Sequence, residues 1–242
     1  MCPKPLKMQK RAVEVLCGLF SKKEAAHLIA GGARHLHSST LASRDTGARA
    51  TTESIETNTV ALYPWEQADP KIASRISSSA QRYDFIREVL SRQSIASRRD
   101  LKERLETVME ELLTNAIYHA YLEPDGAPRY QRRQSVQLPE NDAIEVEFAH
   151  GNEGALLTVT DRGGVLTFDH VARSFSRCYS AGMEQIEAKA SGAGLGIYMV
   201  FELATHLKIF LEPGKSTRIA CWIAAPGSFD PDMFSFNFFE RR

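Results

Sequence analysis

The sequence predicts an α+β fold, in which helices and antiparallel strand pairs occupy separate stretches of the chain. Between residues 100 and 121, apolar residues recur at spacings of three and four, as they do on one face of a helix. Residues 143–160 instead alternate between apolar and polar on either side of a turn at 151–154, which predicts a β-hairpin. Two more strands, 207–212 and 217–224, are expected on the two sides of a Pro-Gly turn.

Composition limits the class of protein. With 242 residues, the chain fits one domain with an extra segment, or one large domain. Its 30 basic residues balance 30 acidic ones, so net charge does not indicate nucleic acid or a membrane surface as a partner. No apolar run approaches the roughly 20 residues of a membrane-spanning helix, so a cytoplasmic protein is expected. The scattered cysteines favour a reducing compartment over a zinc site or a disulfide framework: Cys2, Cys17, Cys178 and Cys221.

Residues 1–37 are expected to form an N-terminal helical segment of two short helices. The first would carry an apolar stripe between Leu6 and Phe20. Ser21, followed three residues later by Glu24, is a capping-box pattern that predicts the start of the second helix, which a double glycine should end.

The residues after these helices are predicted to be irregular. His35 and His37 have no carboxylate beside them, and we interpret them as a solvated helix end rather than a phosphoacceptor or metal site. Residues 38–57 are rich in serine, threonine and alanine and are expected to be a linker. The tail, 227–242, is rich in phenylalanine, and the sequence leaves open whether it packs on the core or contacts a partner.

The remaining elements are predicted partly from residues that end a strand or begin a helix. Residues 60–63 read as a short strand that Pro64 closes. Asp69 and Pro70 suit the first positions of a long helix that would continue to Leu90. Further helices are expected at 168–177 and 197–206.

Three polar residues of the central helix fall on one stripe because they lie four residues apart: Glu111, Asn115 and His119. The amide oxygen of Asn115 suits Mg²⁺, which prefers hard oxygen ligands. The carboxylate of Glu111, one turn away, is placed to accept a proton from a nucleophile or to orient it. Taken alone, the segment favours a solvated helix face, and the downstream motifs change that balance.

Asp161 ends a predicted strand and is followed by Gly163 and Gly164. A carboxylate fixed at a strand end can accept a hydrogen bond from the exocyclic amine of adenine, whereas guanine would present a carbonyl there. Glycine lets the backbone approach a flat ring closely. An ordinary Asp-x-Gly turn is the alternative interpretation.

A glycine run, Gly192-x-Gly194-x-Gly196, leads directly into an apolar helix. The N–H groups of such a loop and the N-terminus of the helix favour phosphate groups. A dinucleotide-binding fingerprint is disfavoured, because that motif follows an apolar strand and polar residues precede Gly192 here.

In this order, the three motifs resemble those of the GHKL ATPase superfamily, the ATP-binding fold shared by histidine-kinase catalytic domains, Hsp90, gyrase B and MutL. Residues 111–121 are most similar to the anti-sigma-factor serine kinases of the RsbW and SpoIIAB type. The resemblance implies a Bergerat-type two-layer α/β sandwich over residues 58–226, with a mixed, mostly antiparallel sheet covered on one face by helices.

The resemblance also implies ATP and Mg²⁺ as cofactors and a role for each site residue. Asn115 would bind the Mg²⁺ that bridges the phosphates, and Glu111 would be the general base toward a protein serine. Asp161 would bind the adenine amine, with Gly163 beneath the ring and Thr217 behind it. The phosphate-side lid would contain a further four residues: Gly192, Gly194, Leu195 and Gly196.

The chain departs from the family pattern at one turn. Val165 stands where the family has a second glycine, with Gly164 one place early, so this turn is expected to differ. The lid before Gly192 is short, as in the serine kinases. Arg177 and Lys189 lie in that lid and are candidates for γ-phosphate contact, although no motif assigns them. We interpret His119 as a packing or hydrogen-bonding residue rather than a catalytic one.

The implied function is transfer of the γ-phosphoryl group of ATP to a serine of a partner protein. The resemblance names a sigma factor or its antagonist as that partner, without nucleic acid or membrane, and allows a homodimer. Two alternatives remain open at this point: a nucleotide-gated binding module that does not phosphorylate, and the ATPase part of a split histidine kinase.

Overall fold

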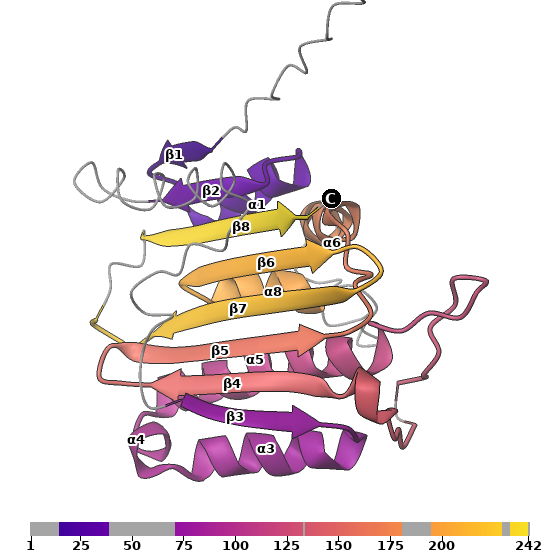
Figure 1. The fold of residues 1–242 in the computed structure, drawn as a ribbon. Helices are drawn as coiled ribbons and strands as arrows, with labels where there is room; N and C mark the ends of the chain where they lie inside the picture. Colours follow the sequence, from indigo (N-terminus) through magenta and orange to yellow (C-terminus); the bar gives the residue numbers. More distant parts are fainter. Residues whose placement is uncertain (1–14, 39–70, 133, 181–194, 229–232, 242) are drawn as a thin grey trace, which may run out of the picture.

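The computed structural model describes residues 15–38, 71–132, 134–180, 195–228 and 233–241. In this part of the chain, eight strands form one sheet in the order β1-β2-β8-β6-β7-β5-β4-β3 (Figure 1). The strands are β1 (Leu16–Gly18), β2 (His35–Ser38), β3 (Lys71–Ile76), β4 (Ile144–His150), β5 (Gly154–Asp161), β6 (His206–Glu212), β7 (Ser216–Ala224) and β8 (Phe234–Glu240).

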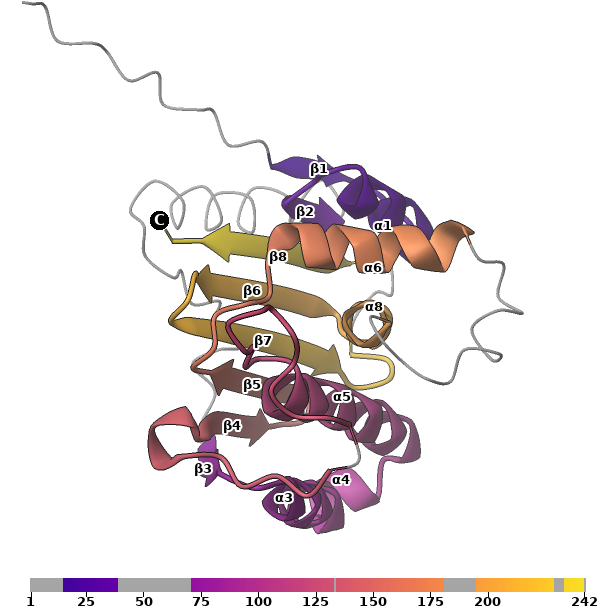
Figure 2. The ribbon, with the colours of Figure 1, turned by 90° about the vertical axis from the view of Figure 1, so that its right-hand side faces the viewer.

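The described helices all lie on one face of this sheet, as Figure 2 shows. They are α1 (Lys22–Ala30), α3 (Ser79–Ser91), α4 (Gln93–Ala96), α5 (Arg99–Tyr118), α6 (Phe168–Ser180) and α8 (Gly196–Leu203), and a 3₁₀ turn spans Glu140–Asp142. The β1–β2 and β6–β8 pairs are parallel and the other pairs antiparallel. The predicted α+β class and two-layer arrangement are therefore confirmed.

The core lies between the central helix and the predicted hairpin. Because successive strand residues point to opposite faces, β4 and β5 turn one apolar row each toward the helices. The buried residues of these two rows are Ile144, Val146, Phe148, Ala155, Leu157 and Val159. Helix α5 buries a stripe with helical spacing against the same core: Leu101, Leu105, Val108, Leu112 and Ile117. The predictions of the central helix and of the hairpin are confirmed.

The expected N-terminal helical segment is correct only in its second helix. Ser21 caps α1 with the predicted capping box to Glu24, and Gly31 ends it. The expectation of a first helix is wrong at residues 16–18, which form β1, and its residues 6–14 lie outside the described part.

The expectation of a solvated helix end at His35 and His37 is also wrong. Both lie in β2 and are buried, with 4% and 6% of their surface exposed. Strand β2 pairs antiparallel with β8, where Asn237 lies opposite His35, so a partner far along the chain decides this structure. Ser38, the first residue of the expected linker, ends β2, and residues 39–57 lie outside the described part.

The helix expected to start at Pro70 is wrong in its first turns. Residues 71–76 form β3, which pairs with β4 so that Ile72 lies opposite Phe148 and Ile76 opposite Ile144. A spacing of four fits a strand face as well as a helix face, so the pairing with β4 decides. The helix α3 begins after Ser78, whose side chain caps it. The strand expected at 60–63 lies outside the described residues.

The C-terminal tail packs on the core, which answers the question that the sequence left open. Phe234, Phe236 and Phe238 of β8 are all buried. The ring of Phe236 lies 6.0 Å from that of Phe175 in α6, and the ring of Phe234 lies 5.9 Å from that of Phe201 in α8. The tail therefore supports two helices that stand on the face of the sheet.

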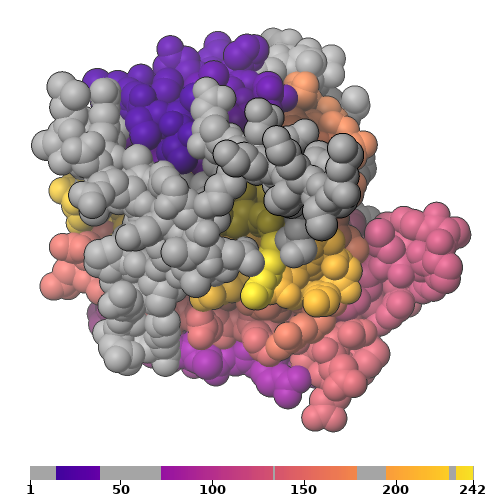
Figure 3. Space-filling view, turned by 45° about the horizontal axis from the view of Figure 1, so that its top comes forward, coloured from indigo at the N-terminus to yellow at the C-terminus, as the bar shows by residue number. Residues whose placement is uncertain are grey.

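Residues 15–38 are also joined to these helices. Helix α1 packs against α6, and Figure 3 shows the indigo N-terminal residues beside the orange end of that helix. The Lys22 Nζ donates to the carbonyl oxygens of Phe201 and Ala204, each at 2.7 Å. Arg104 of α5 donates from Nη2 to the carbonyl of Leu203 at 2.8 Å. Two basic side chains thus donate hydrogen bonds to C-terminal carbonyls of α8, which would otherwise lack partners.

Lys22 leads to a prediction about the pH dependence of stability. The residue keeps some exposure, but its ammonium group lies over the rings of Phe201 and Phe234, at 4.2 and 4.4 Å. Burial lowers the pKa of Lys22 from 10.5 to about 7, against the raising effect of Glu202 and with a small lowering effect of Arg104. The folded protein then binds fewer protons than the unfolded chain between these two values, so stability should increase as pH rises through that window.

We expect the melting temperature of the wild type, relative to that of Lys22→Met, to rise by about 4 °C between pH 7 and pH 9. Scanning calorimetry at the two pH values measures this difference. The neighbouring exposed lysine provides the control, Lys23→Met, which should respond to pH as the wild type does. Parallel pH responses of wild type and Lys22→Met would contradict the assignment.

Candidate functional site

A cavity of about 650 Å³ lies among α5, α6, α8 and the strands β5 and β7. Its lining includes several residues that the sequence singled out: Asn115, His119, Asp161, Val165, Arg177, Gly196 and Thr217. The rest of the lining is largely apolar and includes Leu112, Ala116, Val159, Leu166, Ile197 and Ile219. An apolar cavity with a few convergent polar groups is the usual form of a small-molecule site.

One end of the cavity is formed by Asp161 and Thr217, which are direct partners across the β5–β7 pair. The Asp161 Oδ1 accepts hydrogen bonds from the N–H groups of Gly163, at 2.9 Å, and Gly164, at 3.2 Å. Burial raises the pKa of Asp161 from 3.8 to about 6, although these N–H donors act in the opposite direction. An ionised carboxylate has about four lone-pair sites, so it keeps capacity to accept from a ligand.

Thr217 adds a second polar group at this end. Its side chain is buried beside the Asp161 carboxyl group, and hydrogen bonding from the N–H and the hydroxyl of Thr217 lowers the pKa of Asp161 against the larger effect of burial. A hydroxyl has one donor and two acceptor lone pairs, so Thr217 keeps capacity to accept a hydrogen bond from a ligand or a water. An acceptor and a hydroxyl side by side at the wall of an apolar cavity fit the amine edge of adenine.

The turn after Asp161 needs its two glycines for close packing. A Cβ at Gly163 would lie 1.6 Å from the carbonyl oxygen of Ala120, just after α5. Gly164 has a φ of +62°, and a Cβ there would lie 2.5 Å from the carbonyl oxygen of Glu212. The turn therefore fixes the Asp161 strand end between α5 and the β6–β7 connection, and Val165 lines the cavity.

The other end brings the central helix and the glycine run together. Gly196 is the first residue of α8, and a Cβ there would lie 2.2 Å from Glu111 Oε2 and 3.4 Å from Asn115 Nδ2. Burial raises the pKa of Glu111. The charge of Arg132, whose Nη2 lies 3.8 Å from Glu111 Oε2, lowers this pKa. Two charges have smaller effects on it: Glu110 raises the pKa and Arg82 lowers it.

The structure describes only some of the remaining candidate residues. Leu195 is the N-cap of α8, and Gly192, Gly194 and Lys189 lie outside the described residues. His119 is the C-cap of α5 and lines the cavity, and burial lowers its pKa.

Helix α6 contributes residues that sequence reasoning did not select. His170 and Arg173 line the cavity together with Arg177. Their spacing of three and four places them on one face of α6, which is the signal that was available in the sequence. The Nε of Arg173 donates to the carbonyl of Asp169 at 3.1 Å. The two arginines give this wall of the cavity a basic character, which suits phosphate groups.

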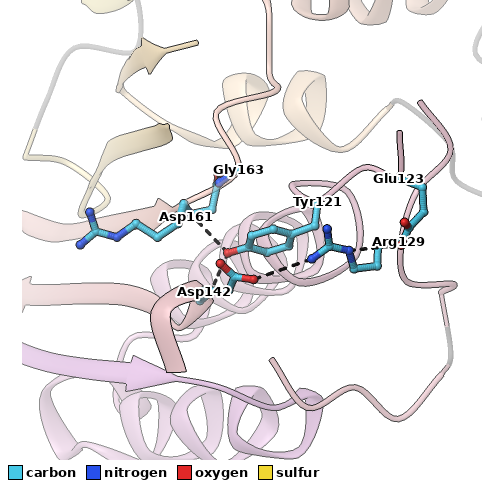
Figure 4. A network of polar contacts seen from close by, with 7 residues as sticks. Tyr121, Glu123, Arg129, Asp142, Asp161 and Gly163 are labelled. Atoms are coloured by element: carbon cyan, nitrogen blue, oxygen red, sulfur yellow. Dashed lines mark hydrogen bonds and ion pairs between the residues drawn. The ribbon is translucent and has the colours of Figure 1, made fainter. Parts of the chain in front are cut away.

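A polar network connects the Asp161 turn to the loop after α5 (Figure 4). The Tyr121 hydroxyl donates to the carbonyl of Asp142 at 2.6 Å and accepts from the N–H of Arg162 at 3.4 Å. Arg129 forms ion pairs with Glu123, at 3.2 Å, and with Asp142, at 3.9 Å. The network joins the loop, the start of β4 and the Asp161 turn.

Comparison with known proteins agrees with this geometry. The family model of the histidine kinase-, DNA gyrase B-, and HSP90-like ATPases matches residues 100–227. The match runs from the first turn of α5 to beyond β7 and contains both ends of the cavity. A search of curated proteins found no match. Among the described residues, no helix combines the length and apolarity that a membrane-spanning segment requires.

Proposed function

The chain belongs to the family of histidine kinase-, DNA gyrase B- and HSP90-like ATPases, and on this premise we propose that it is an ATP-dependent protein serine kinase of the anti-sigma-factor type. It would bind ATP with Mg²⁺ and transfer the γ-phosphoryl group to a serine of a partner protein, either a sigma factor's antagonist or a related regulator. The carrying observation is the close approach of Gly196 to Glu111 and Asn115, which leaves no room for a Cβ and puts a candidate base and a candidate metal ligand beside the start of a helix.

The base end of the nucleotide would occupy the Asp161 end of the cavity. Asp161 would accept a hydrogen bond from the adenine amine, and Thr217 would supply the buried hydroxyl. Guanine would turn a carbonyl toward the carboxylate, leaving two acceptors face to face, so the site favours adenine. Val159 and Ile219 offer apolar contact to the ring.

The metal would be held by Asn115 together with phosphate oxygens and water. Among the described residues, no group of three or more histidine, cysteine, aspartate or glutamate side chains is arranged to hold a metal ion. One amide oxygen together with phosphate oxygens and water fits Mg²⁺, because this ion keeps several waters and is usually bound by one or two side chains plus substrate phosphates.

Phosphoryl transfer then needs little covalent chemistry from the protein. The serine oxygen bonds to the γ-phosphorus as its proton passes to the Glu111 carboxylate. The bond from the γ-phosphorus to the β–γ bridging oxygen breaks, and its electron pair leaves with ADP. Positioning and charge neutralisation account for most of the rate in such a site. Burial, which raises the pKa of Glu111, makes this carboxylate a stronger base.

Glu111→Gln tests the assignment of the base. We expect phosphoryl transfer to the partner to fall by about 100-fold or more, because general-base catalysis typically contributes that much. ATP affinity should change by less than about threefold, since the amide keeps the shape of the side chain. Transfer of labelled phosphate and calorimetric titration with Mg·ATP measure the two quantities.

The control is Glu103→Gln, on the exposed face of the same helix, where Glu103 pairs with Arg99. Equal transfer by wild type and Glu111→Gln would remove Glu111 from the mechanism. ATP binding without transfer to any protein would favour a nucleotide-gated binding module, and an acid-labile product would favour a split histidine kinase. Absence of ATP binding by the wild type would refute the proposal.

A further inference from the structure

The loop between α5 and β4, residues 119–139, is held by hydrogen bonds to the end of α5 and to residues 77–79; Arg133 lies outside the described residues. Tyr118 donates from its hydroxyl to the carbonyl of Gln134 at 2.9 Å. The N–H of Val136 donates to Ser79 Oγ at 3.1 Å, and the N–H of Leu138 donates to the carbonyl of Ser77 at 2.7 Å. These contacts fix the backbone of the loop close to Arg132.

Arg132 extends from this loop to Glu111. Its Nη2 lies 3.8 Å from Glu111 Oε2, and the two side chains are 36% and 22% exposed. The charge of Arg132 also lowers the pKa of His119, after the larger effect of burial. The guanidinium therefore lies near the polar stripe of α5. A partly exposed ion pair at this distance contributes little to stability and is easily exchanged for a stronger partner.

A triphosphate would offer such a partner. The phosphate end of the site lies where Gly196 contacts Glu111 and Asn115, within reach of a guanidinium that already contacts Glu111. A guanidinium binds phosphate through two parallel hydrogen bonds, which are stronger than an ion pair with a carboxylate at 3.8 Å.

We propose that Arg132 recognises the γ-phosphate of ATP, exchanging its contact with Glu111 for this phosphate when a triphosphate binds. The inference rests on the proposed function, because it assigns the phosphate end of the cavity to ATP. It makes Arg132 a residue that distinguishes ATP from ADP and that controls the base through its own position.

The exchange has a consequence for Glu111. The charged groups that face this carboxylate from the described elements are Glu110 of α5, Arg82 of α3 and Arg132 of the loop. Arg82 is held by Thr114, at 2.6 Å, and lies 3.6 Å from Glu110, so it stays in place. When Arg132 moves to the phosphate, its charge lowers the pKa of Glu111 less. Burial then raises this pKa with less opposition, and the carboxylate becomes a stronger base. A bound triphosphate would thus release Glu111 from its ion pair with Arg132, whereas ADP would not.

Arg132→Gln tests this inference by calorimetry with Mg·ADP and with the Mg²⁺ complex of an ATP analogue carrying a non-hydrolysable β–γ imido bridge. We expect the variant to lose about tenfold or more in affinity for the analogue, with ADP affinity changed by less than about twofold. In the protein without nucleotide, carboxyl-carbon NMR should show the pKa of Glu111 raised in the variant. Arg132→Lys should recover part of the preference for the analogue.

The matched control is Arg218→Gln. Arg218 of β7 forms an ion pair of the same length, 3.8 Å, with Glu147 of β4 and is 35% exposed. Neither arginine is part of the cavity lining, but Arg218 is paired with a carboxylate that has no proposed role. This control should bind both nucleotides as the wild type does. An equal loss of affinity for ADP and for the analogue in Arg132→Gln, or an unchanged affinity for both, would overturn the role of Arg132 alone. No binding of either nucleotide by the wild type would overturn the proposed function itself.

Discussion

Replacing Asp161 by asparagine is expected to weaken ATP binding by about 100-fold or more, because one buried charged acceptor is lost and two donors are brought together. The asparagine oxygen can still accept from the N–H groups of Gly163 and Gly164, which the Asp161 carboxylate binds now. Its NH₂ group would then face the adenine amine. Calorimetric titration with Mg·ATP measures the loss.

The same substitution should leave the protein at least as stable as the wild type at neutral pH. Burial raises the pKa of Asp161 to about 6, so the folded protein binds more protons than the unfolded chain between pH 3.8 and pH 6. The contribution of Asp161 to stability therefore falls as pH rises through this window, and above it the carboxylate is a cost that asparagine does not carry. Thermal unfolding at pH 5 and pH 8 measures this difference.

The role of Asp161 would be refuted by either of two results. One is an unchanged affinity for ATP in Asp161→Asn. The other is a large loss of stability at pH 8, which would show that the carboxylate supports the fold rather than a ligand. The wild type itself offers a further check, since its affinity should fall as pH is lowered from 7 to 5 and the acceptor is protonated.

The local sequence pattern was sufficient to predict the elements that have a regular hydrophobic period or a complete set of capping residues. Helix α5 and the β4–β5 hairpin bury one regular row each, and α1 carries a complete capping box at Ser21. The motif residues Glu111, Asn115 and Asp161 sit on these elements, so their approximate places followed from the sequence. The approach of Gly196 to Glu111 and Asn115 could be seen only in the tertiary structure.

Where the sequence failed, a distant partner decides the structure. Strand β1 has three residues, too few for a period to show, and pairs with β2. His35 and His37 look solvent-exposed in sequence, but β2 pairs with β8, almost two hundred residues later. The spacing of Ile72 and Ile76 fits both a helix and a strand, and only their pairing with β4 shows that they lie in a strand. Arg132 was hidden for the same reason, because the contacts of Tyr118 and its neighbours set the loop conformation.

Gly163→Ala is expected to destabilise the protein by about 3 kcal/mol, at the upper end of what overpacking usually costs. The added methyl group would lie 1.6 Å from the carbonyl oxygen of Ala120. This atom belongs to the backbone, so no side-chain rotation can relieve the clash, and either the turn or the residues after α5 must move. ATP binding should be lost as well, since Asp161 is fixed by the N–H of Gly163.

Gly151→Ala is the matched control for this substitution. Gly151 lies in the turn of the same hairpin, where, apart from Gly151 and its two chain neighbours, no atom of the described residues lies within 4 Å of the added carbon. Its effect should stay within about 0.5 kcal/mol, as is usual for surface substitutions. Denaturant midpoints measure both changes. A Gly163→Ala variant that lost ATP binding but kept the wild-type denaturant midpoint would contradict this account. Its methyl group would then extend into the cavity, and the turn would not be packed against the residues after α5.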